Sequence, residues 1–196
     1  LPPLRSNCTC DDVRAWIHPD AGGPLVVQVD GRDVLLSDND AIWLKDPIEH
    51  LSNIDADILI QRDDWPRQPS GVAMCMGFAM LRCRGKGMAE FIKVFHQLVE
   101  MRGDDQVGMN MAVTKLGVEF DHNETRSDMR NHESTGFGYG VVRDLPDNFT
   151  VALLPHSLYP RFCTDTPVTN ETVVAHCLLR GRREVKMRRM NLWYLD

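Results

Sequence analysis

Short hydrophobic runs separated by polar or turn-forming residues dominate the chain and predict a series of strands. The runs are bounded by Gly, Pro, Asp and Asn positions, which is the usual pattern of strands in a sheet. We expect such strands at 24–29, 33–37, 56–61, 149–154 and 172–177. The longer run 72–82 predicts a further strand with Gly77 in its middle, and a glycine within a strand often marks the close approach of a ligand or of another backbone segment.

Two segments are predicted to be helices, the first from its periodicity and the second from its capping residues. Apolar residues recur every three or four positions along 87–101, which is the spacing of one helix face. Residues 104–117 predict a second helix, capped by one of the two aspartates at its start and ended by Gly117. The polar, Gly-rich stretches 62–71 and 121–140 predict loops. Strands that alternate with helices indicate an α/β protein with a mixed or mostly parallel sheet.

Composition restricts the classes of protein that the chain can represent. The 196 residues, of which 43 % are apolar, suffice for one domain with a hydrophobic core. The formal net charge of −6 argues against a nucleic-acid partner. The sequence contains no apolar run long enough to span a membrane, so we expect membrane contact only through an anchor that is not present in this chain.

Glycosylation sequons and cysteines bear on the compartment. Asn-x-Thr occurs at Asn7, Asn123, Asn148 and Asn170, whereas residue frequencies would give roughly one such sequon by chance. The excess favours a glycoprotein of the secretory pathway, with coincidence in polar loops as the alternative. The six cysteines lack the paired spacing of a zinc site, and in an oxidising lumen some of them would form disulfides. The sequence leaves their pairing open.

Two acids follow the apolar run 33–37 directly. Ligands of open α/β sheets lie beyond the carboxyl ends of the strands, which is where Asp38 and Asp40 are expected. In an extended segment two carboxylates one residue apart point the same way, so both can reach one hard divalent cation. Such a cation can stabilise a departing diphosphate as a Lewis acid. The alternative is a solvated turn. The second Asp-x-Asp, Asp55 and Asp57, precedes its apolar run, so we interpret it as a turn at the entry of a strand.

Three further stretches carry candidate chemistry. Gln106 and Asn110 are four residues apart and share a helix face, with a capped helix whose polar residues face water as the alternative. His176, at the end of a predicted strand, is a candidate third metal ligand or a satisfied core or surface histidine. The basic stretch 180–186 could hold a diphosphate, although a solvated charged face is the more usual explanation.

The order of these motifs resembles the nucleotide-diphospho-sugar transferases of plants and algae. This group contains the cell-wall α-xylosyltransferases and the extensin arabinosyltransferases. The resemblance covers roughly residues 33–196 and rests on these stretches, in this order: "LLSDNDAIWLKDP", "DADILIQRDD", "MCMGFAMLR", "DDQVGMN", "LPHSLYPRF", "AHCLLRGRREVK" and "NLWYLD". An ordered set of motifs is far more specific than any one of them.

The resemblance implies a Golgi-resident, metal-dependent glycosyltransferase. It implies the GT-A fold, a mixed sheet flanked by helices, and a reaction that moves a sugar from a nucleotide-diphosphate donor to a glycan or glycoprotein acceptor. The donor implied is a UDP-sugar and the metal Mn²⁺ or Mg²⁺. Residues 33–196 would form the GT-A-like core. Residues 1–32 would be an atypical or truncated N-terminal segment, because the nucleotide-binding half expected there is incomplete.

The metal and diphosphate ligands are carried over position by position. Asp38 and Asp40 match the family's Asp-x-Asp and would bind the metal and the donor diphosphate. His176 matches the family's C-terminal histidine, a metal ligand. Gly181 and Lys186 match the Gly and Lys of the same motif, and Lys186 would neutralise charge on the leaving diphosphate.

The resemblance also assigns two catalytic positions, and the chain differs from the family at one further position. Asp105 and Gln106 match the family's Asp-Asp-Gln stretch, which faces the sugar and the acceptor, so the resemblance implies that they lie near the reacting carbon. Leu178 stands where the family usually has Asn. This departure and the short N-terminal segment leave open an inactive remnant of the fold that serves as a binding or partner module.

A phosphohydrolase or phosphotransferase of the haloacid-dehalogenase type is a further alternative. The stretch "VLLSDND" superficially resembles the start of that family, in which the first Asp, here Asp38, is a nucleophile. That family requires Thr or Val directly after the second acid, where this chain has Ala41. A phosphoaspartate at Asp38 would support this alternative.

Overall fold

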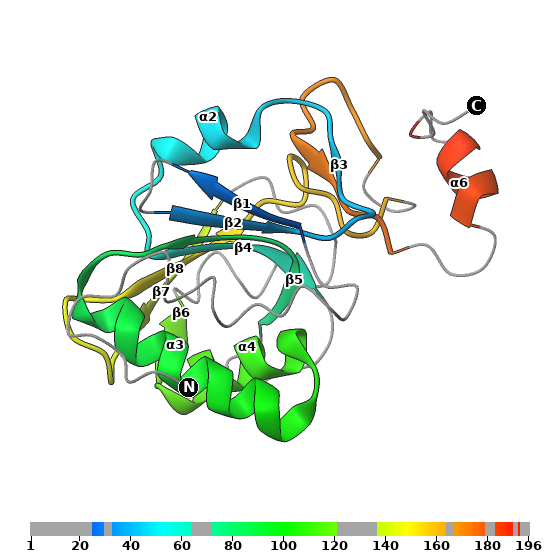
Figure 1. The fold of residues 1–196 in the computed structure, drawn as a ribbon. Coiled ribbons are helices and arrows are strands. Elements are labelled where there is room, and N and C mark those ends of the chain that lie inside the picture. Colours follow the sequence, from blue (N-terminus) through cyan, green and yellow to red (C-terminus); the bar gives the residue numbers. More distant parts are fainter. Residues whose placement is uncertain are drawn as a thin grey trace.

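A seven-stranded mixed sheet organises the part of the chain that this computed structural model describes, which is residues 25–29, 33–63, 72–120, 137–163, 167–178, 183–189 and 192 (Figure 1). The strand order is β1-β2-β5-β4-β8-β7-β6. The strands are β1 (Leu25–Val29), β2 (Asp33–Ser37), β4 (Ile58–Asp63), β5 (Ala73–Arg82), β6 (Val118–Phe120), β7 (Gly138–Val142) and β8 (Thr150–Leu154). A separate ribbon pairs β3 (Ile42–Trp43) with β9 (Val174–Ala175).

The directions of the strands confirm a mixed sheet. Strands β4 and β8 run parallel, and the other described pairs of the large sheet run antiparallel. The alternative of a mostly parallel sheet is wrong. Parallel neighbours need a long crossover connection, whereas the links from β1 to β2 and from β7 to β8 are short enough only for antiparallel hairpins.

Helices cover both faces of the sheet. Helices α3 (Gly85–Arg102) and α4 (Asp105–Lys115) lie against one face, and the short helix α2 (Pro47–Ser52) lies on the other (Figure 1). Helix α6 (Arg183–Arg189) lies at the edge of the molecule. None of the helices in the described part of the chain combines the length and hydrophobicity that a membrane span requires.

Side-chain alternation along the central strands fills two cores. In β2, Val34 and Leu36 enter the larger core beneath α3 and α4, and Leu35 between them enters the core beneath α2. The same alternation continues in β4, where Ile60 faces the larger core and Leu59 the smaller one. Because both faces are covered, consecutive positions within these strands are hydrophobic, which explains the continuous apolar runs in the sequence.

Strand β5 contains an irregularity at the glycine singled out in the sequence. Before Gly77, Met74 and Met76 face the larger core at even positions. After it, Ala79 and Leu81 face the same core at odd positions. The register with β4 shifts at the same point, so extra residues of β5 are accommodated as a bulge. The bulge turns the backbone at Gly77 towards the edge where β2 ends.

The two predicted helices are confirmed, with boundaries close to those expected. Residues 87–101 lie within α3, which ends at Gly103 in the left-handed conformation with φ of 67°. Asp104 caps α4, because its carboxylate accepts a hydrogen bond from the N–H of Val107. The tight link brings the start of α4 back towards the sheet.

Helix α2 was not predicted, although the sequence contains a signal for it. Asp46 is its N-cap and accepts hydrogen bonds from the N–H groups of Ile48 and Glu49. Pro47 occupies the first helical position, which suits its fixed φ. The helix is too short for a hydrophobic period to show, so the capping residues are the signal that could have located it.

Several strand boundaries differ from those expected. Strand β7 starts at Gly138, so the predicted loop 121–140 is wrong at its end, and residues 121–136 lie outside the described part. Pairing with β6 and β8 stabilises this strand despite its glycines. Strand β4 starts and ends two residues later than the predicted strand 56–61. Its start is delayed because the Asp57 carboxylate accepts from the N–H of Thr150 at 2.8 Å, which forms the expected turn before the strand.

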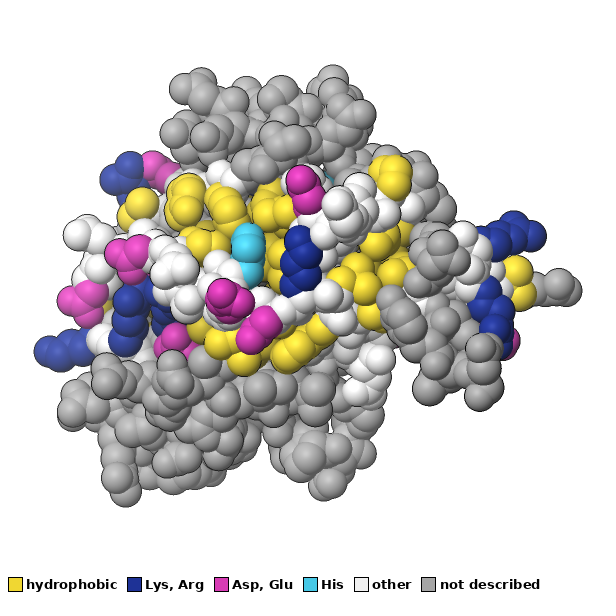
Figure 2. Space-filling model, turned by 90° about the horizontal axis from the view of Figure 1, so that it is seen from above, with side chains coloured by type: hydrophobic (Ala, Val, Ile, Leu, Met, Phe, Trp, Pro, Cys, Tyr) yellow, Lys and Arg dark blue, Asp and Glu magenta, His cyan; other side chains and the backbone are white. Residues whose placement is uncertain are grey.

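The face that carries α2 contains a polar hollow. Figure 2 shows acidic, basic and hydrophobic side chains interspersed on this face rather than one extended field of a single charge. The hollow has a volume of about 550 Å³ and is lined by Lys45, Glu49, His50 and Glu171, among others. Backbone bonds to the carbonyl of Val173 place Lys45 at one end of the β3–β9 ribbon. The other end of the ribbon leads to the acids that follow β2.

Candidate functional site

The loop that leaves β2 brings the two expected acids to the edge of the sheet. Asp38 and Asp40 occupy a tight turn, closed by a hydrogen bond from the N–H of Ala41 to the carbonyl of Asp38 at 3.0 Å. The expectation of an extended segment is therefore wrong. The turn is attached to the bulge of β5, because the N–H of Asp38 donates to the carbonyl of Gly77 at 2.8 Å.

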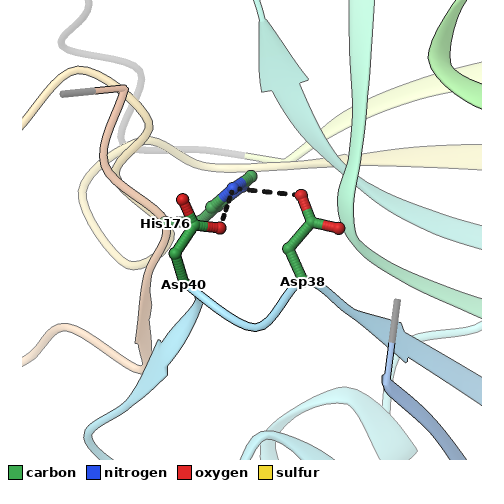
Figure 3. Close-up of side chains that lie close together, drawn as sticks. All are labelled: Asp38, Asp40 and His176. Carbon is green, nitrogen blue, oxygen red and sulfur yellow. Dashed lines mark ion pairs between the residues drawn. The ribbon is translucent and has the colours of Figure 1, made fainter. Parts of the chain in front are cut away.

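Both carboxylates converge on one nitrogen of His176 (Figure 3). The Nε2 atom lies 3.3 Å from an oxygen of Asp38 and 3.2 Å from an oxygen of Asp40. One ligand atom from each residue lies within 4.8 Å of those of the other two. The Asp38 side chain is 42 % exposed and that of His176 only 3 %. The cluster is thus open to solvent on the carboxylate side and closed beneath the imidazole.

The position of His176 depends on Gly77. His176 follows β9 directly, and its N–H donates to the carbonyl of Pro160 at 3.1 Å. The imidazole lies against the bulge of β5, where a Cβ atom on Gly77 would overlap the ring. The close approach expected at this glycine is therefore made by a histidine side chain of the candidate site.

Gln61 determines which ring nitrogen of His176 faces the acids. Its amide nitrogen donates to the carbonyls of Tyr159 and Pro160, both at 3.1 Å, so its amide oxygen points the other way. That oxygen lies 3.0 Å from Nδ1 of His176 and accepts the proton that this nitrogen carries. Since Nδ1 is thereby committed as a donor, Nε2 is the nitrogen available to a cation.

The charge of His176 reflects competing effects. Burial disfavours the charged imidazole and lowers its pKa, but hydrogen bonds to Asp38, Asp40 and Cys75 outweigh burial and raise the pKa to about 10. Arg161 opposes protonation, since its guanidinium lies 3.2 Å from Nε2. The upward direction holds because two carboxylates outnumber one guanidinium that is itself paired. A cation bound at Nε2 has to displace this proton.

A buried ion pair extends the site towards α4. The Nε atom of Arg161 donates to Asp63 at 3.2 Å, and the two side chains are 13 % and 6 % exposed. The same oxygen of Asp63 accepts from the amide of Gln106 at 3.3 Å. The predicted catalytic residue Gln106 is therefore linked to His176 through Asp63 and Arg161.

Two backbone bonds and a disulfide hold Arg161 beside His176. Besides the bond from His176 to Pro160, the N–H of Leu178 donates to the carbonyl of Arg161 at 2.7 Å. Cys163 and Cys177 form a disulfide between the same two segments. Two further described cysteines, Cys75 and Cys83, are buried.

The start of α4 contributes a second acidic group. Asp105 accepts from the N–H of Gln106 at 2.7 Å. Burial raises the pKa of Asp105, the hydrogen bond to Gln106 opposes this, and the charges of Asp38 and Asp104 raise it further. Asp105 is therefore near enough to Asp38 for their charges to interact, although the two acids lie far apart in the sequence.

Asn110 has a different position from the one expected. Its side chain is fully buried, with the amide oxygen accepting from the N–H of Met74 and the amide nitrogen donating to the carbonyls of Met74 and Gln106. Gln106 and Asn110 both lie in α4, one helical turn apart as predicted. Asn110, however, fixes α4 to β5 rather than facing a ligand or water.

The structure does not describe the contacts of the two predicted diphosphate ligands, Gly181 and Lys186. Gly181 lies outside the described residues. Lys186 belongs to the backbone of α6, and its side chain is outside the description.

The residues present fit a hard divalent cation. Two carboxylate oxygens and one imidazole nitrogen are ligands that Mn²⁺ and Mg²⁺ accept, and they leave room for oxygens of a ligand. The partner of Nδ1 supplies the second-layer contact typical of metal-binding histidines.

Sequence reasoning missed four residues of the site. Gln61 and Asp63 end the apolar run of β4 with polar residues, as Asp38 does after β2, so the same signal could have located them. Cys75, whose sulfur lies 3.6 Å from Nδ1 of His176, has no such signal because it sits within a hydrophobic strand. Arg161 also has none, since only tertiary contacts bring it to His176.

The fold and the cluster together define an α/β protein with a candidate cation site at the edge of a mixed sheet. The chain belongs to the nucleotide-diphospho-sugar transferase family, whose model matches residues 26–190. Family membership and the mixed sheet with flanking helices agree with the expected GT-A-like fold. Membership of this family also indicates transfer of a sugar from a nucleotide-diphosphate donor. No curated protein and no solved structure matches the chain significantly.

Proposed function

We propose that this protein is a metal-dependent glycosyltransferase that moves a sugar from a UDP-sugar to a glycan or glycoprotein acceptor. The observation that carries the proposal is the convergence of Asp38 and Asp40 on Nε2 of His176 in a member of this family. A simple solvated turn would not require a buried imidazole against a glycine bulge.

Asp38, Asp40 and His176 would hold Mn²⁺ or Mg²⁺. When bound, the ion supplies Lewis-acid stabilisation of the leaving diphosphate. The carboxylates are exposed enough to meet a donor from solvent, and Gln61 keeps the imidazole in the orientation that presents Nε2. Gly181 and Lys186 remain our assignment for further contacts with the donor diphosphate.

Asp105 and Gln106 are the proposed catalytic residues. A partly buried carboxyl group with a raised pKa is suited to accept the proton of an acceptor hydroxyl or to stabilise positive charge at the reacting carbon. Gln106 is held by Asp63, so its amide is oriented before a substrate arrives.

The test of this function is binding of UDP by calorimetry with and without Mn²⁺. We expect wild type to bind UDP only with Mn²⁺, and Asp38→Asn/Asp40→Asn to lose at least about a hundredfold in affinity, because both charged ligands are removed. Asp55→Asn, in the second Asp-x-Asp, is the matched control and should bind like wild type, since Asp55 is an exposed surface acid.

The two outcomes have different meanings. Mn²⁺-dependent binding that disappears in the double variant would support the transferase and justify a screen of donor sugars by release of UDP. Folded wild-type protein that binds no UDP would refute an active enzyme and favour the inactive remnant of the fold.

We further propose that the protein works in the lumen of the secretory pathway, in the Golgi, as a glycoprotein. Asn148 and Asn170 are exposed, and a disulfide joins Cys163 to Cys177. Protein from a secreting eukaryotic cell should lose apparent mass on treatment with an N-glycosidase, and Asn170→Gln should remove one step of that loss. An unchanged mass in untreated wild type would argue against this location.

A further inference from the structure

We infer that Arg161 is a binding residue for the diphosphate of the nucleotide donor. The inference rests on the proposed function, because it assigns a further ligand at the same site. The NH1 atom of Arg161 lies 3.2 Å from Nε2 of His176, the atom on which both Asp38 and Asp40 converge. A guanidinium is thus built into the edge of the cation site.

The positions of the charged groups favour an anion between the cation site and Arg161. Asp38 and Asp40 together balance the two charges of a divalent cation, and Asp63 balances Arg161. A cation at the cluster and the guanidinium would nevertheless repel each other at short range in a partly buried site. A diphosphate relieves that repulsion, because its oxygens can contact both positive groups at once.

Arg161 is also oriented for this role. Asp63 binds the Nε edge of the guanidinium, so the terminal nitrogens point away from Asp63 and towards His176. The backbone carbonyl of Arg161 accepts a hydrogen bond from the N–H of Leu178, and the disulfide between Cys163 and Cys177 links the same two segments. The planar guanidinium matches two phosphate oxygens, and its fixed position lowers the entropy lost on binding.

The alternative is that Arg161 only supports the fold through its ion pair with Asp63. The two roles make opposite predictions for the cation alone. If Arg161 binds the diphosphate, its removal should weaken binding of UDP and of inorganic pyrophosphate, yet leave the affinity for Mn²⁺ unchanged or higher, because a nearby positive charge is gone. A supporting role would lower the affinity for Mn²⁺ and for the anions together.

The design has to avoid leaving the buried carboxylate of Asp63 without its guanidinium partner. Removing Arg161 alone leaves the buried carboxylate of Asp63 without its partner, which is strongly destabilising. The informative comparison is therefore between Asp63→Asn, whose side-chain amide oxygen can still accept a hydrogen bond from the guanidinium, and Asp63→Asn/Arg161→Gln, which lacks both charges. Arg143→Gln is the control for loss of an arginine, since Arg143 pairs with Glu119 at the surface.

Calorimetry with Mn²⁺, with UDP plus Mn²⁺ and with pyrophosphate plus Mn²⁺ tests the inference. Relative to Asp63→Asn, the double variant should lose about tenfold to a hundredfold in affinity for both anions, the usual effect of a charge-assisted hydrogen bond. Its affinity for Mn²⁺ alone should not fall. Asp63→Asn/Arg161→Lys should recover part of the loss, because a lysine restores the charge without the planar fork.

Three results would overturn the inference. Equal affinity of the two variants for UDP would show that Arg161 does not contact the diphosphate, while leaving the proposed function intact. A parallel loss of Mn²⁺ and UDP affinity would assign Arg161 to support of the fold. If wild type binds no UDP with Mn²⁺ present, the proposed function fails, and the inference fails with it.

Discussion

Two buried polar side chains on opposite sides of β5, Asn110 and His176, look alike in the sequence but differ in their surroundings. Each has hydrophobic neighbours in the sequence, and each is almost completely buried, with 0 % and 2 % of the residue exposed. Asn110 bonds only to backbone groups, those of Met74 and Gln106. One nitrogen of His176, in contrast, faces two carboxylates and a guanidinium.

This difference separates a structural polar group from a functional one. Both side-chain N–H groups of Asn110 donate to main-chain carbonyls and its oxygen accepts from a main-chain N–H, so no donor remains for a ligand. The partners of His176 Nε2 are charged, exceed what one nitrogen can satisfy, and open to solvent through Asp38. Loss of Asn110 should therefore affect stability, and changes around His176 should affect binding.

The largest expected effect in this comparison is that of Asn110→Ala. The substitution leaves the N–H and carbonyl of Met74 without their partner inside the protein. We expect the free energy of unfolding to fall by about 2–4 kcal/mol, measured by urea denaturation. Gln97→Ala, an exposed amide on α3, should change it by less than about 0.5 kcal/mol.

The folded fraction of Asn110→Ala should still bind Mn²⁺ with wild-type affinity. A loss of Mn²⁺ affinity without a loss of stability would reverse the assignment of Asn110 and place it in the binding site.

Gln61→Met should have the next largest effect, which is a lower affinity for a divalent cation. The variant removes the acceptor of Nδ1, so the proton of the neutral ring is no longer held on that nitrogen. We expect the affinity for Mg²⁺ to fall about tenfold to a hundredfold, the usual effect of a lost second-layer partner. Nitrogen-15 NMR of labelled histidines, recorded with Mg²⁺ bound, should show the Nδ1–H form in wild type and a mixture in the variant.

His50 and His96 provide internal controls, since neither ring contacts Gln61 in the described hydrogen bonds. An unchanged tautomer in Gln61→Met would mean that another group fixes the ring of His176.

Asp105→Asn should have the smallest effect, an increase in stability that depends on pH. A carboxyl whose pKa is raised by folding keeps its proton to higher pH than in the unfolded chain. Its contribution to stability is thus fully present below the ordinary value of 3.8 and is lost as pH rises through the folded pKa. At pH 7 the amide should therefore stabilise the protein, by about 0.5–1 kcal/mol, the low end for single substitutions.

Thermal unfolding at a series of pH values measures this effect. The advantage of Asp105→Asn should shrink as the pH approaches 3.8, and the variant should lose transfer activity if Asp105 is catalytic. A stability gain that is constant with pH would show that ionisation of Asp105 is not its cause.

Local patterns were sufficient for the elements with strong hydrophobic periodicity. Strand β2 and helix α3 follow from the sequence, because covered faces impose apolar positions along them. Helix α4 followed from its capping aspartates and Gly117 rather than from a hydrophobic period. The direction of the strands and the existence of β7 depend on pairing with distant segments, which a local pattern does not contain. The bulge at Gly77 was visible only as a glycine within a strand.

The same division applies to the site. Asp38, Asp40 and His176 could be proposed because their residue types and positions after strands resemble a family motif. Arg161 lies within the quoted stretch "LPHSLYPRF", but that stretch gave it no chemical role, which follows only from contacts with Asp63 and His176. Residues that orient others are harder to identify than residues that bind directly.

The disulfide between Cys163 and Cys177 gives the site a dependence on how the protein is made. It joins the segment that carries Arg161 to the one that carries His176, so oxidation of these thiols restricts both before any ligand arrives. Recombinant chain produced in a reducing bacterial cytosol would contain every ligand residue but would lack this covalent link. If such material fails to bind, the missing disulfide would be a sufficient explanation. Protein prepared from an oxidising host is therefore the appropriate starting point.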